Sequence, residues 1–294
     1  MNNDEWTGIL IILGIIFIII FGGTKGASVN GLFSNRNQTP VQKQVSIQNQ
    51  IYHAQNEVED LKSKIAEGEA KKTDSTYKGM VKLAYVNRSP DVSQEYIAIQ
   101  VMSNATNIPI TGWILKSLNT QNSVSIPKGT YLFQSGKINE ENNIILKPYD
   151  ILYVITGISP NGTNFETNKC SGYLEQYQDY VPYLYSSCPL PRDEDLSSIS
   201  KSGLNDACLD YINSLPSCTV PTKLLPSDWS YQCTDFIQKK INYPACVDAH
   251  RNDTDFYKNE WRVYLKRSQS LWKNEREIIV LYDNLGKVVD TLKY

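Results

Sequence analysis

The six cysteines of the chain all fall in one segment, and this clustering constrains the fold more than any other feature of the sequence. The remainder of the 294 residues contains none. An even number of clustered cysteines is typical of a disulfide framework in an oxidising compartment. A metal site and free structural thiols are the alternatives, but no Cys-x-x-Cys pair is present to favour zinc. We therefore predict disulfide bonds among Cys170, Cys188, Cys208, Cys218, Cys233 and Cys246.

The segment before the first cysteine has the pattern of a small β-domain. Ile97, Ile99 and Val101 recur with the two-residue period of a half-buried strand, and the chain then turns at 103–107 and returns through 108–115. Gly112, directly before Trp113, suits a bulge or tight bend because glycine permits close backbone approach. Turn residues separate further short apolar runs, which is typical of a sandwich or barrel. We expect these strands at 81–86, 123–126, 130–133, 144–146, 150–156 and 165–169.

The end of the chain completes this β-domain. Residues 277–290 form two apolar runs around a four-residue turn that contains Gly286, which predicts a hairpin. The segments that resemble the lamin-tail domain family, in order, are Glu95-Tyr96-Ile97, Thr111-Gly112-Trp113, Ile126-Pro127-Lys128-Gly129-Thr130 and this hairpin with Tyr294. The resemblance covers 79–169 and 256–294. It implies an immunoglobulin-like β-sandwich and a role in recognition, as in nuclear lamins and in bacterial membrane and extracellular proteins, and it carries over no catalytic residues.

The segment 170–255, which departs from the family pattern, is predicted to be a helical insertion. Helices are expected at 206–215 and 228–241. Their candidate caps are Asn205 or Asp206 and Ser227, and their stops are Pro216 and Pro244. A third helix, at 255–272, is expected to pack on the sandwich as part of its core. Its apolar stripe contains Tyr257, Trp261, Tyr264, Leu265, Ser268 and Trp272.

The expected helices also suggest a pairing of the cysteines. Sequence alone allows fifteen pairings of six cysteines. If the first two helices form an antiparallel hairpin, the start of one neighbours the end of the other. Nested bonds are then expected between Cys208 and Cys246 and between Cys218 and Cys233. Cys170 and Cys188 would close a separate loop.

Residues 1–24 are predicted to be an uncleaved transmembrane anchor. The apolar run at 6–24 would form a helix of about 28 Å, close to the thickness of the hydrocarbon core. No Lys or Arg precedes it, unlike in a cleavable signal peptide.

The orientation of this anchor is a conflict between two patterns. The basic residues Lys25, Arg36 and Lys43 follow the apolar run, so the positive-inside rule would leave the body in the cytoplasm. The cysteines indicate the reverse. Because large domains are translocated largely regardless of a few charges, we expect a single-pass protein of the cytoplasmic membrane with an extracytoplasmic body.

Residues 25–78 are predicted to be a flexible tether followed by a heptad helix. Apolar positions from Ile51 alternate spacings of four and three, which is typical of a coiled-coil seam. The seam would join two copies in parallel through Ile51, Val58, Leu61 and Ile65. The alternative, in which this stripe packs on the protein's own sandwich, stays open because the seam is barely three heptads long.

Acid–base chemistry has few candidates in this sequence, since His53 and His250 are the only histidines. His250 could join Asp248, Asp253 and Asp255 around a divalent cation, which would suit a metal-dependent hydrolase. However, Asp253 is also a natural helix cap. No Gly-x-Ser-x-Gly elbow, phosphate loop or His-Glu-x-x-His is present. We therefore expect no enzyme activity, no cofactor and no resident metal.

A tyrosine-rich stretch at 172–185 is the candidate ligand face. Its side chains could stack on sugar rings or hold a peptide, or they could instead fill the thin core of a disulfide-rich unit. The tyrosines concerned are Tyr173, Tyr177, Tyr180, Tyr183 and Tyr185.

Three functions follow as hypotheses. The first is a non-catalytic, membrane-anchored module that binds a protein or an envelope polymer. The second is a structural stalk protein of the envelope that oligomerises through its heptads, and the third is a hydrolase centred on His250. The formal charge of −2 gives no basic footprint for a phosphate backbone, so nucleic acid is not an expected partner.

Overall fold

The computed structural model describes residues 52–62, 73–198 and 205–294. The chain divides into two compact units, Met1–Glu69 and Ala70–Tyr294.

In the first unit, the described residues are helical and exposed along their whole length. Val58 and Leu61 of the expected seam are 47% and 56% exposed. The other two seam residues, Ile51 and Ile65, lie outside the described residues, as does the expected membrane span at 6–24. Within the described ranges, no helix has the length and apolar character needed to cross a bilayer.

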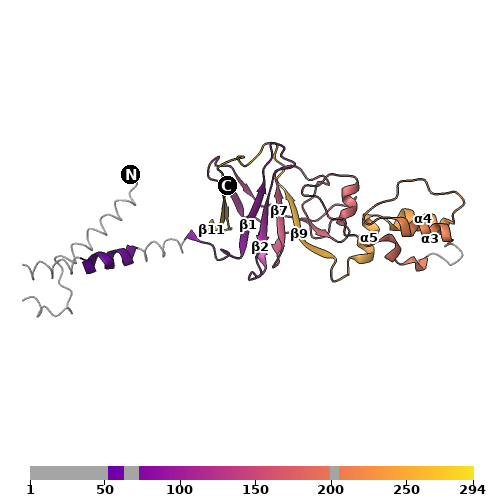
Figure 1. Ribbon diagram of the computed structural model, residues 1–294, viewed down its shortest axis with the longest axis horizontal. Helices are drawn as coiled ribbons and strands as arrows, with labels where there is room; N and C mark the ends of the chain where they lie inside the picture. Colours follow the sequence, from indigo (N-terminus) through magenta and orange to yellow (C-terminus); the bar gives the residue numbers. More distant parts are fainter. Residues whose placement is uncertain (1–51, 63–72, 199–204) are drawn as a thin grey trace, which may run out of the picture. The chain divides into compact units, whose positions relative to one another are not determined.

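The second unit is mainly β (Figure 1). Its strands are short and are separated by turns, as the sequence predicts. They are β1 (Val81–Asn87), β2 (Tyr96–Val101), β3 (Ile108–Pro109), β4 (Ile114–Ser117), β5 (Ser123–Ser125), β6 (Ile145–Leu146), β7 (Ile151–Ile155), β8 (Phe165–Asn168), β9 (Tyr257–Tyr264), β10 (Ile278–Tyr282) and β11 (Val288–Lys293).

These strands form two principal sheets. The larger has the order β1-β2-β7-β9-β8, and Figure 1 shows four of its strands side by side. The smaller has the order β11-β10-β4-β5, and β3 pairs with β6 in a separate ribbon. Neighbours are antiparallel except β7 and β9, which are parallel. We call residues 79–169 and 256–294 the β-domain and residues 170–255 the insertion.

The inner faces of the two sheets share one hydrophobic core. Alternate residues of β2 (Ile97, Ile99 and Val101) point into it, as their period of two predicts. Trp113 and Trp261 are fully buried there.

Two turns confirm the expectations placed on glycine. Gly112 has φ +87°, and a Cβ at this position would lie 2.9 Å from the side-chain oxygen of Asn284. Gly286, with φ +72°, lies in the turn of the closing β10–β11 hairpin, where Asp283 Oδ1 accepts hydrogen bonds from the amides of Leu285 and Lys287. Both turns therefore depend on the left-handed conformation that glycine adopts at low cost.

The expected strand at 130–133 is wrong. Within this fully described stretch, the only β-bridge joins Thr130 to Phe165. Tyr131 packs toward the core between the sheets, whereas Phe133 packs under the insertion. The segment therefore divides its aromatic side chains between two cores.

The expected packing helix at 255–272 is also wrong, because residues 257–264 form strand β9. Residues 261–264 of this strand are all buried, because its two faces pack against the two hydrophobic cores. Trp261 and Val263 point into the core between the sheets, and Arg262 and Tyr264 point to the opposite face. A strand buried on both faces lacks an apolar–polar alternation, and its aromatic residues then imitate a helical stripe.

The insertion contains three short α-helices in its described part: α3 (Asp206–Ser214), α4 (Tyr231–Lys240) and α5 (Tyr243–His250). Of the two candidate caps of α3, Asn205 is the cap, and its side chain accepts a hydrogen bond from the Cys208 amide. The cap of α4 is Ser230 rather than Ser227. Pro244 does not end a helix but lies in the first turn of α5, where the missing amide hydrogen is not needed.

Disulfide bonds are confirmed, but the predicted pairing is wrong throughout. The bonds join Cys170 to Cys246, Cys188 to Cys218, and Cys208 to Cys233. The prediction placed Cys246 in a turn just past the end of α4, whereas this cysteine lies within a further helix, α5, and pairs with Cys170 at the start of the insertion. Cys208 and Cys233 both lie in the first turns of their helices, so the bond joins two helix beginnings.

A second hydrophobic core lies under the insertion. It contains all six half-cystines, buried residues of the three helices and several aromatic rings. The outer face of the larger sheet contributes Ala98, Tyr153, Ile155 and Phe165. The insertion therefore uses that face of the sheet as one wall of its core.

Candidate functional site

The five tyrosines of the predicted ligand face divide into two groups. Tyr173 and Tyr180 are only 4% and 3% exposed and belong to the core under the insertion. Tyr177, Tyr183 and Tyr185 are 63%, 57% and 75% exposed. Only the last three can meet a ligand without rearrangement of the core.

A buried arginine of β9 holds residues 182–185, which we call the tyrosine segment, on the β-domain. Arg262 is fully buried and donates hydrogen bonds to the carbonyl oxygens of Pro182 and Tyr183. Its Nε donates to Glu260 Oε1 at 2.8 Å. A buried guanidinium is stable when its donors are satisfied in this way, so this contact fixes the tyrosine segment against the sheet.

The same arginine lies in a row of side chains that crosses the outer face of the larger sheet. Tyr85, Ala98, Tyr153 and Arg262 are opposite one another on β1, β2, β7 and β9. The Arg262 guanidinium carbon lies 4.6 Å from the centre of the Tyr153 ring. Because Ala98 is small, the hydroxyl groups of Tyr85 and Tyr153 approach to 3.5 Å above it.

Tyr96 completes an aromatic cluster on this face. Its ring centre lies 6.0 Å from that of Tyr85 and 5.6 Å from that of Tyr153, with the rings nearly perpendicular. Burial and the neighbouring Tyr85 raise the pKa of Tyr96 to about 12, and burial also raises the pKa of Tyr153. These phenols therefore stay neutral at physiological pH. Outward-facing tyrosines in strands were a signal in the sequence, but their proximity depends on strand register.

A cavity of about 330 Å³ opens beside Tyr185. This volume is at the lower end of the range of small-molecule sites. Its wall comes from β8, β9 and the tyrosine segment. The lining residues are Thr167, Asn168, Ser171, Leu184, Tyr185, Ser187, Lys258, Asn259 and Glu260.

Glu260 connects the cavity to the aromatic cluster. Glu260 lines the cavity, and its carboxylate pairs with Arg262, which lies over Tyr153. Tyr185 also lines the cavity, and the Tyr183 carbonyl accepts a hydrogen bond from Arg262. We call the cavity with Tyr183, Tyr185 and the aromatic cluster the junction site.

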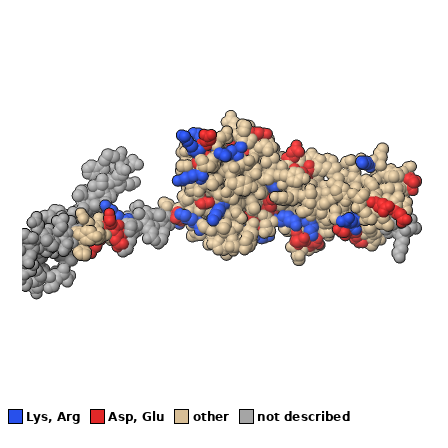
Figure 2. All heavy atoms as spheres, viewed as in Figure 1, with Lys and Arg blue, Asp and Glu red and all other residues tan. Residues whose placement is uncertain are grey.

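Charge on the surface is mixed in sign. Figure 2 shows Lys and Arg interspersed with Asp and Glu over the described part of this face, without a large patch of either sign. This distribution agrees with the formal charge of −2. On this face, the described residues offer no basic stripe of the kind that binds a phosphate backbone.

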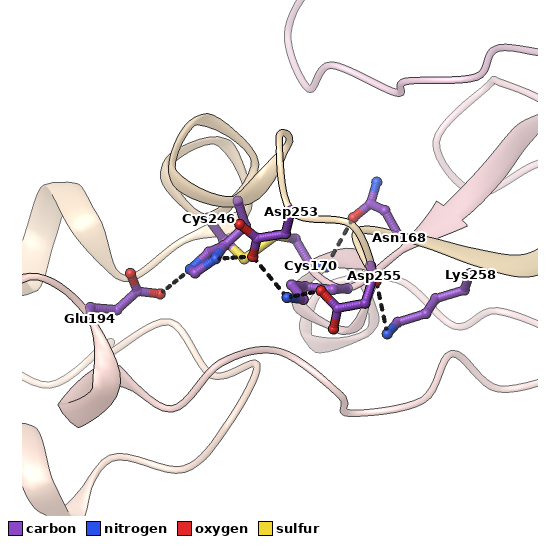
Figure 3. A network of polar contacts seen from close by, with 9 residues as sticks. Asn168, Cys170, Glu194, Cys246, Asp253, Asp255 and Lys258 are labelled. Carbon is purple, nitrogen blue, oxygen red and sulfur yellow. Dashed lines mark hydrogen bonds and ion pairs between the residues drawn. A yellow bond between two sulfur atoms is a disulfide. The ribbon is translucent and has the colours of Figure 1, made fainter.

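The predicted acidic cluster around His250 is a network of ion pairs (Figure 3). His250 Nδ1 lies 2.8 Å from Asp253 Oδ2, and Nε2 lies 3.1 Å from Glu194 Oε1. Lys169 Nζ donates to Asp253 Oδ2 at 2.8 Å and to Asp255 Oδ1 at 2.6 Å. The network lies beside the Cys170–Cys246 bond (Figure 3).

The electrostatics favour a charged His250 ring. Partial burial alone would lower the pKa of His250, but the hydrogen bonds with Asp253 and Glu194 outweigh it, so the pKa lies above its usual value. With a carboxylate at each ring nitrogen, neither nitrogen is free to accept a proton from a substrate.

The carboxylates of this network are also occupied. Lys169 neutralises Asp253 and Asp255, and hydrogen bonding to it lowers the pKa of both carboxyl groups. Across the described ranges, no group of three His, Cys, Asp or Glu side chains is arranged to hold a metal ion. In this geometry the cluster is an electrostatic link between the α5 end, the Glu194 loop and the start of the insertion.

Comparison with protein-family models and with curated proteins found no match to this chain. The candidate site therefore depends on its geometry alone.

Proposed function

We propose that this chain is a non-catalytic, membrane-anchored module that binds a ligand outside the cytoplasmic membrane. The β-domain is proposed to be an immunoglobulin-like sandwich of the lamin-tail type. The motifs of 79–169 and 256–294 support this assignment, together with two sheets that share one core. Recognition is the usual role of such domains.

The junction site is the observation that carries the proposed function. It combines exposed aromatic rings, a cavity lined mostly by polar residues and a rigid support in the buried Arg262. Binding sites commonly combine these features, because a preorganised support reduces the entropy lost when a ligand binds. Both ring nitrogens of His250 are hydrogen-bonded to carboxylates, so this residue gives no comparable support to a hydrolase.

The extracytoplasmic location rests on three disulfide bonds and on the apolar run at 6–24. Disulfide bonds persist in oxidising compartments and are rare in the cytosol. Protease added to intact spheroplasts should therefore digest the body of the protein. Full protection, together with six alkylatable thiols, would contradict this location.

Binding at the junction site is tested with isolated cell envelopes. The full-length chain, held in lipid nanodiscs, should cosediment with envelopes of the cell that produces it. Tyr185→Ala should weaken this binding about tenfold, since an aromatic contact and its buried area contribute more than 1 kcal/mol. Tyr177→Ala is the matched control, because Tyr177 is also an exposed tyrosine of the insertion but does not line the cavity. Equal binding by both variants would exclude the junction site.

A second candidate function is a structural stalk that associates through the heptad helix. The exposed apolar side chains of Val58 and Leu61 favour it. Replacing both by Glu should convert a parallel dimer of the full-length chain into a monomer in sedimentation experiments. Tyr52→Glu is the matched control, since Tyr52 is 62% exposed and lies outside the predicted seam. A monomeric wild-type chain at high micromolar concentration would contradict the stalk function.

A further inference from the structure

We propose that the ligand of the junction site is a neutral, hydroxyl-rich saccharide, one unit of which occupies the cavity beside Tyr185. This inference rests on the proposed binding function and adds the chemical class of the ligand. The alternative class is a peptide segment of a protein, which would need an apolar pocket for an anchoring side chain in the same place.

The walls of the cavity present hydrogen-bonding groups of both kinds. Ser187, Asn259 and Tyr185 line the cavity, and among the described residues their side chains make no hydrogen bond to the rest of the protein. An amide and two hydroxyl groups supply both donors and acceptors. A sugar ring carries hydroxyl groups that are likewise both donors and acceptors, so the two sets are complementary.

The other polar atoms of the cavity are already committed and give it a fixed shape. Thr167 Oγ1 donates to the Glu260 carbonyl at 3.2 Å, and Ser171 Oγ accepts from the Asn168 amide at 2.8 Å. Asn168 Nδ2 donates to the Tyr243 hydroxyl. The free groups therefore stand on a wall that is held by internal hydrogen bonds.

The aromatic part of the site suits the faces of a sugar. Tyr185 is 75% exposed at the edge of the cavity, so its ring is free to stack on the apolar C–H face of a pyranose. The phenol oxygen remains available to a hydroxyl group at the ring edge.

A peptide would find no apolar anchor in this cavity. Peptides and protein partners are commonly held by a side chain buried in an apolar pocket. The one aliphatic residue of the lining, Leu184, is 1% exposed because it packs into the core under the insertion. The carbon surface that remains accessible therefore belongs to the Tyr185 ring and to the stems of polar side chains.

The charges at the cavity favour a neutral ligand. Glu260 is paired with Arg262, so Lys258 is the remaining charged residue of the lining, and its Nζ donates to the Asp255 carbonyl oxygen at 3.3 Å. A phosphate or uronic acid would meet this single lysine, whereas anion sites present clustered positive groups.

Fractionated envelopes provide the test, with the full-length chain in nanodiscs as the binding protein. Delipidated envelopes are divided into a saccharide fraction, from exhaustive proteinase digestion, and a protein fraction, from acidic chemical deglycosylation. Binding to the saccharide fraction and not to the protein fraction is the expected result. Tyr185→Ala and Asn259→Ala should each weaken it about tenfold, whereas Tyr177→Ala should retain wild-type binding. Disulfide mapping of each variant checks that the insertion has folded.

The contrary results are distinct from one another. Binding only to the protein fraction would overturn the saccharide and leave the proposed binding function intact. Binding to the saccharide fraction that neither Tyr185→Ala nor Asn259→Ala weakens would overturn the cavity as its site. Absence of binding to undivided envelopes would overturn the proposed function and this inference together.

Discussion

The two hydrophobic cores of this molecule are built from different materials. The core between the sheets consists mainly of aliphatic side chains and tryptophans, from the strands and from the segments that connect them, and it contains no half-cystine. The core under the insertion contains all six half-cystines and many tyrosines, and its described helices have only eight to ten residues. Two broad sheets bury enough apolar area to fold without covalent links, whereas short helices do not.

The cores also depend on each other unequally. The insertion core takes Ala98, Tyr153, Ile155 and Phe165 from the outer face of the larger sheet. The core between the sheets takes no residue from 170–255 in the part of the insertion that the structure describes. Loss of the β-domain should therefore unfold both cores, and loss of the insertion should unfold one.

The largest effect is expected from Trp113→Ala. Trp113 is fully buried between the sheets, and removal of a buried tryptophan costs up to about 5 kcal/mol. Both cores should lose protection in hydrogen exchange at the same denaturant concentration. Leu285→Ala is the control, since this turn residue is 80% exposed and should change stability by less than about 0.5 kcal/mol. An insertion that stays protected in Trp113→Ala would refute the unequal dependence.

The next effect concerns Cys170 and Cys246. Their bond closes a loop with a sequence separation of 76, so the chain-entropy model gives a loss of about 4.5 kcal/mol when both are replaced by Ser. The insertion should then lose its hydrogen-exchange protection while the sheets keep theirs. Replacing Cys208 and Cys233, whose separation is 25, should cost slightly less, about 3.5 kcal/mol. Simultaneous loss of the sheets would show that the two cores are one cooperative unit.

Arg262→Met tests the contact that joins the two regions. The change leaves the carbonyls of Pro182 and Tyr183 and the carboxylate of Glu260 without their buried donor, which should cost about 3 kcal/mol. Arg88→Met is the matched control. Arg88 also lies over a tyrosine ring, that of Tyr294, and donates to a carbonyl oxygen, but it is exposed. Denaturant titration should show a loss well below 1 kcal/mol for the control, and equal losses would contradict a role for burial.

The smallest effect is expected at His250 and depends on pH. The folded protein raises the pKa of this ring, so protonated His250 stabilises the fold fully below the unfolded pKa of about 6.5. That stabilisation is lost as pH rises through the folded pKa. Burial raises the pKa of Glu166 to about 8. This shift also makes the stability of the fold decline as pH rises. His250→Gln should therefore remove part, but not all, of the decline in melting temperature between pH 5 and 9. His53→Gln is the control for this comparison. An unchanged profile would mean that the network is not an electrostatic link.

The sequence predicted the β-domain more reliably than the insertion, for reasons that particular residues show. Strands with one solvent-facing side, such as the first half of β1, keep an alternating pattern, and the Gly286 turn identifies the closing hairpin. Strand β9 is covered on both sides, so Trp261 and Tyr264 matched a helix as well as a strand. The fold of a short segment that is buried on both faces depends on partners distant in the sequence.

The junction site was predictable only in part. Tyr183 and Tyr185 were candidates from the sequence, and the buried Leu184 between them shows the period of two that makes both point outward. Tyr173 and Tyr180 could not be separated from them without knowledge of the core. Tyr85, Tyr96 and Tyr153 meet only because of strand register, and the disulfide pairing depended on the unforeseen helix α5.

The position of β9 has a consequence for biosynthesis. The chain leaves the larger sheet after its edge strand β8 and returns as β9, which fills the space between β7 and β8. A polypeptide emerging from a ribosome or a translocation channel cannot close this sheet until the cysteine-rich segment has also emerged. The edge of β7 stays unpaired during that interval, and an unpaired edge can associate with other chains. The cysteines are therefore oxidised in the same interval in which the edge of β7 waits for β9. An oxidoreductase or chaperone that acts on the emerging insertion would also control how long the edge of β7 is exposed.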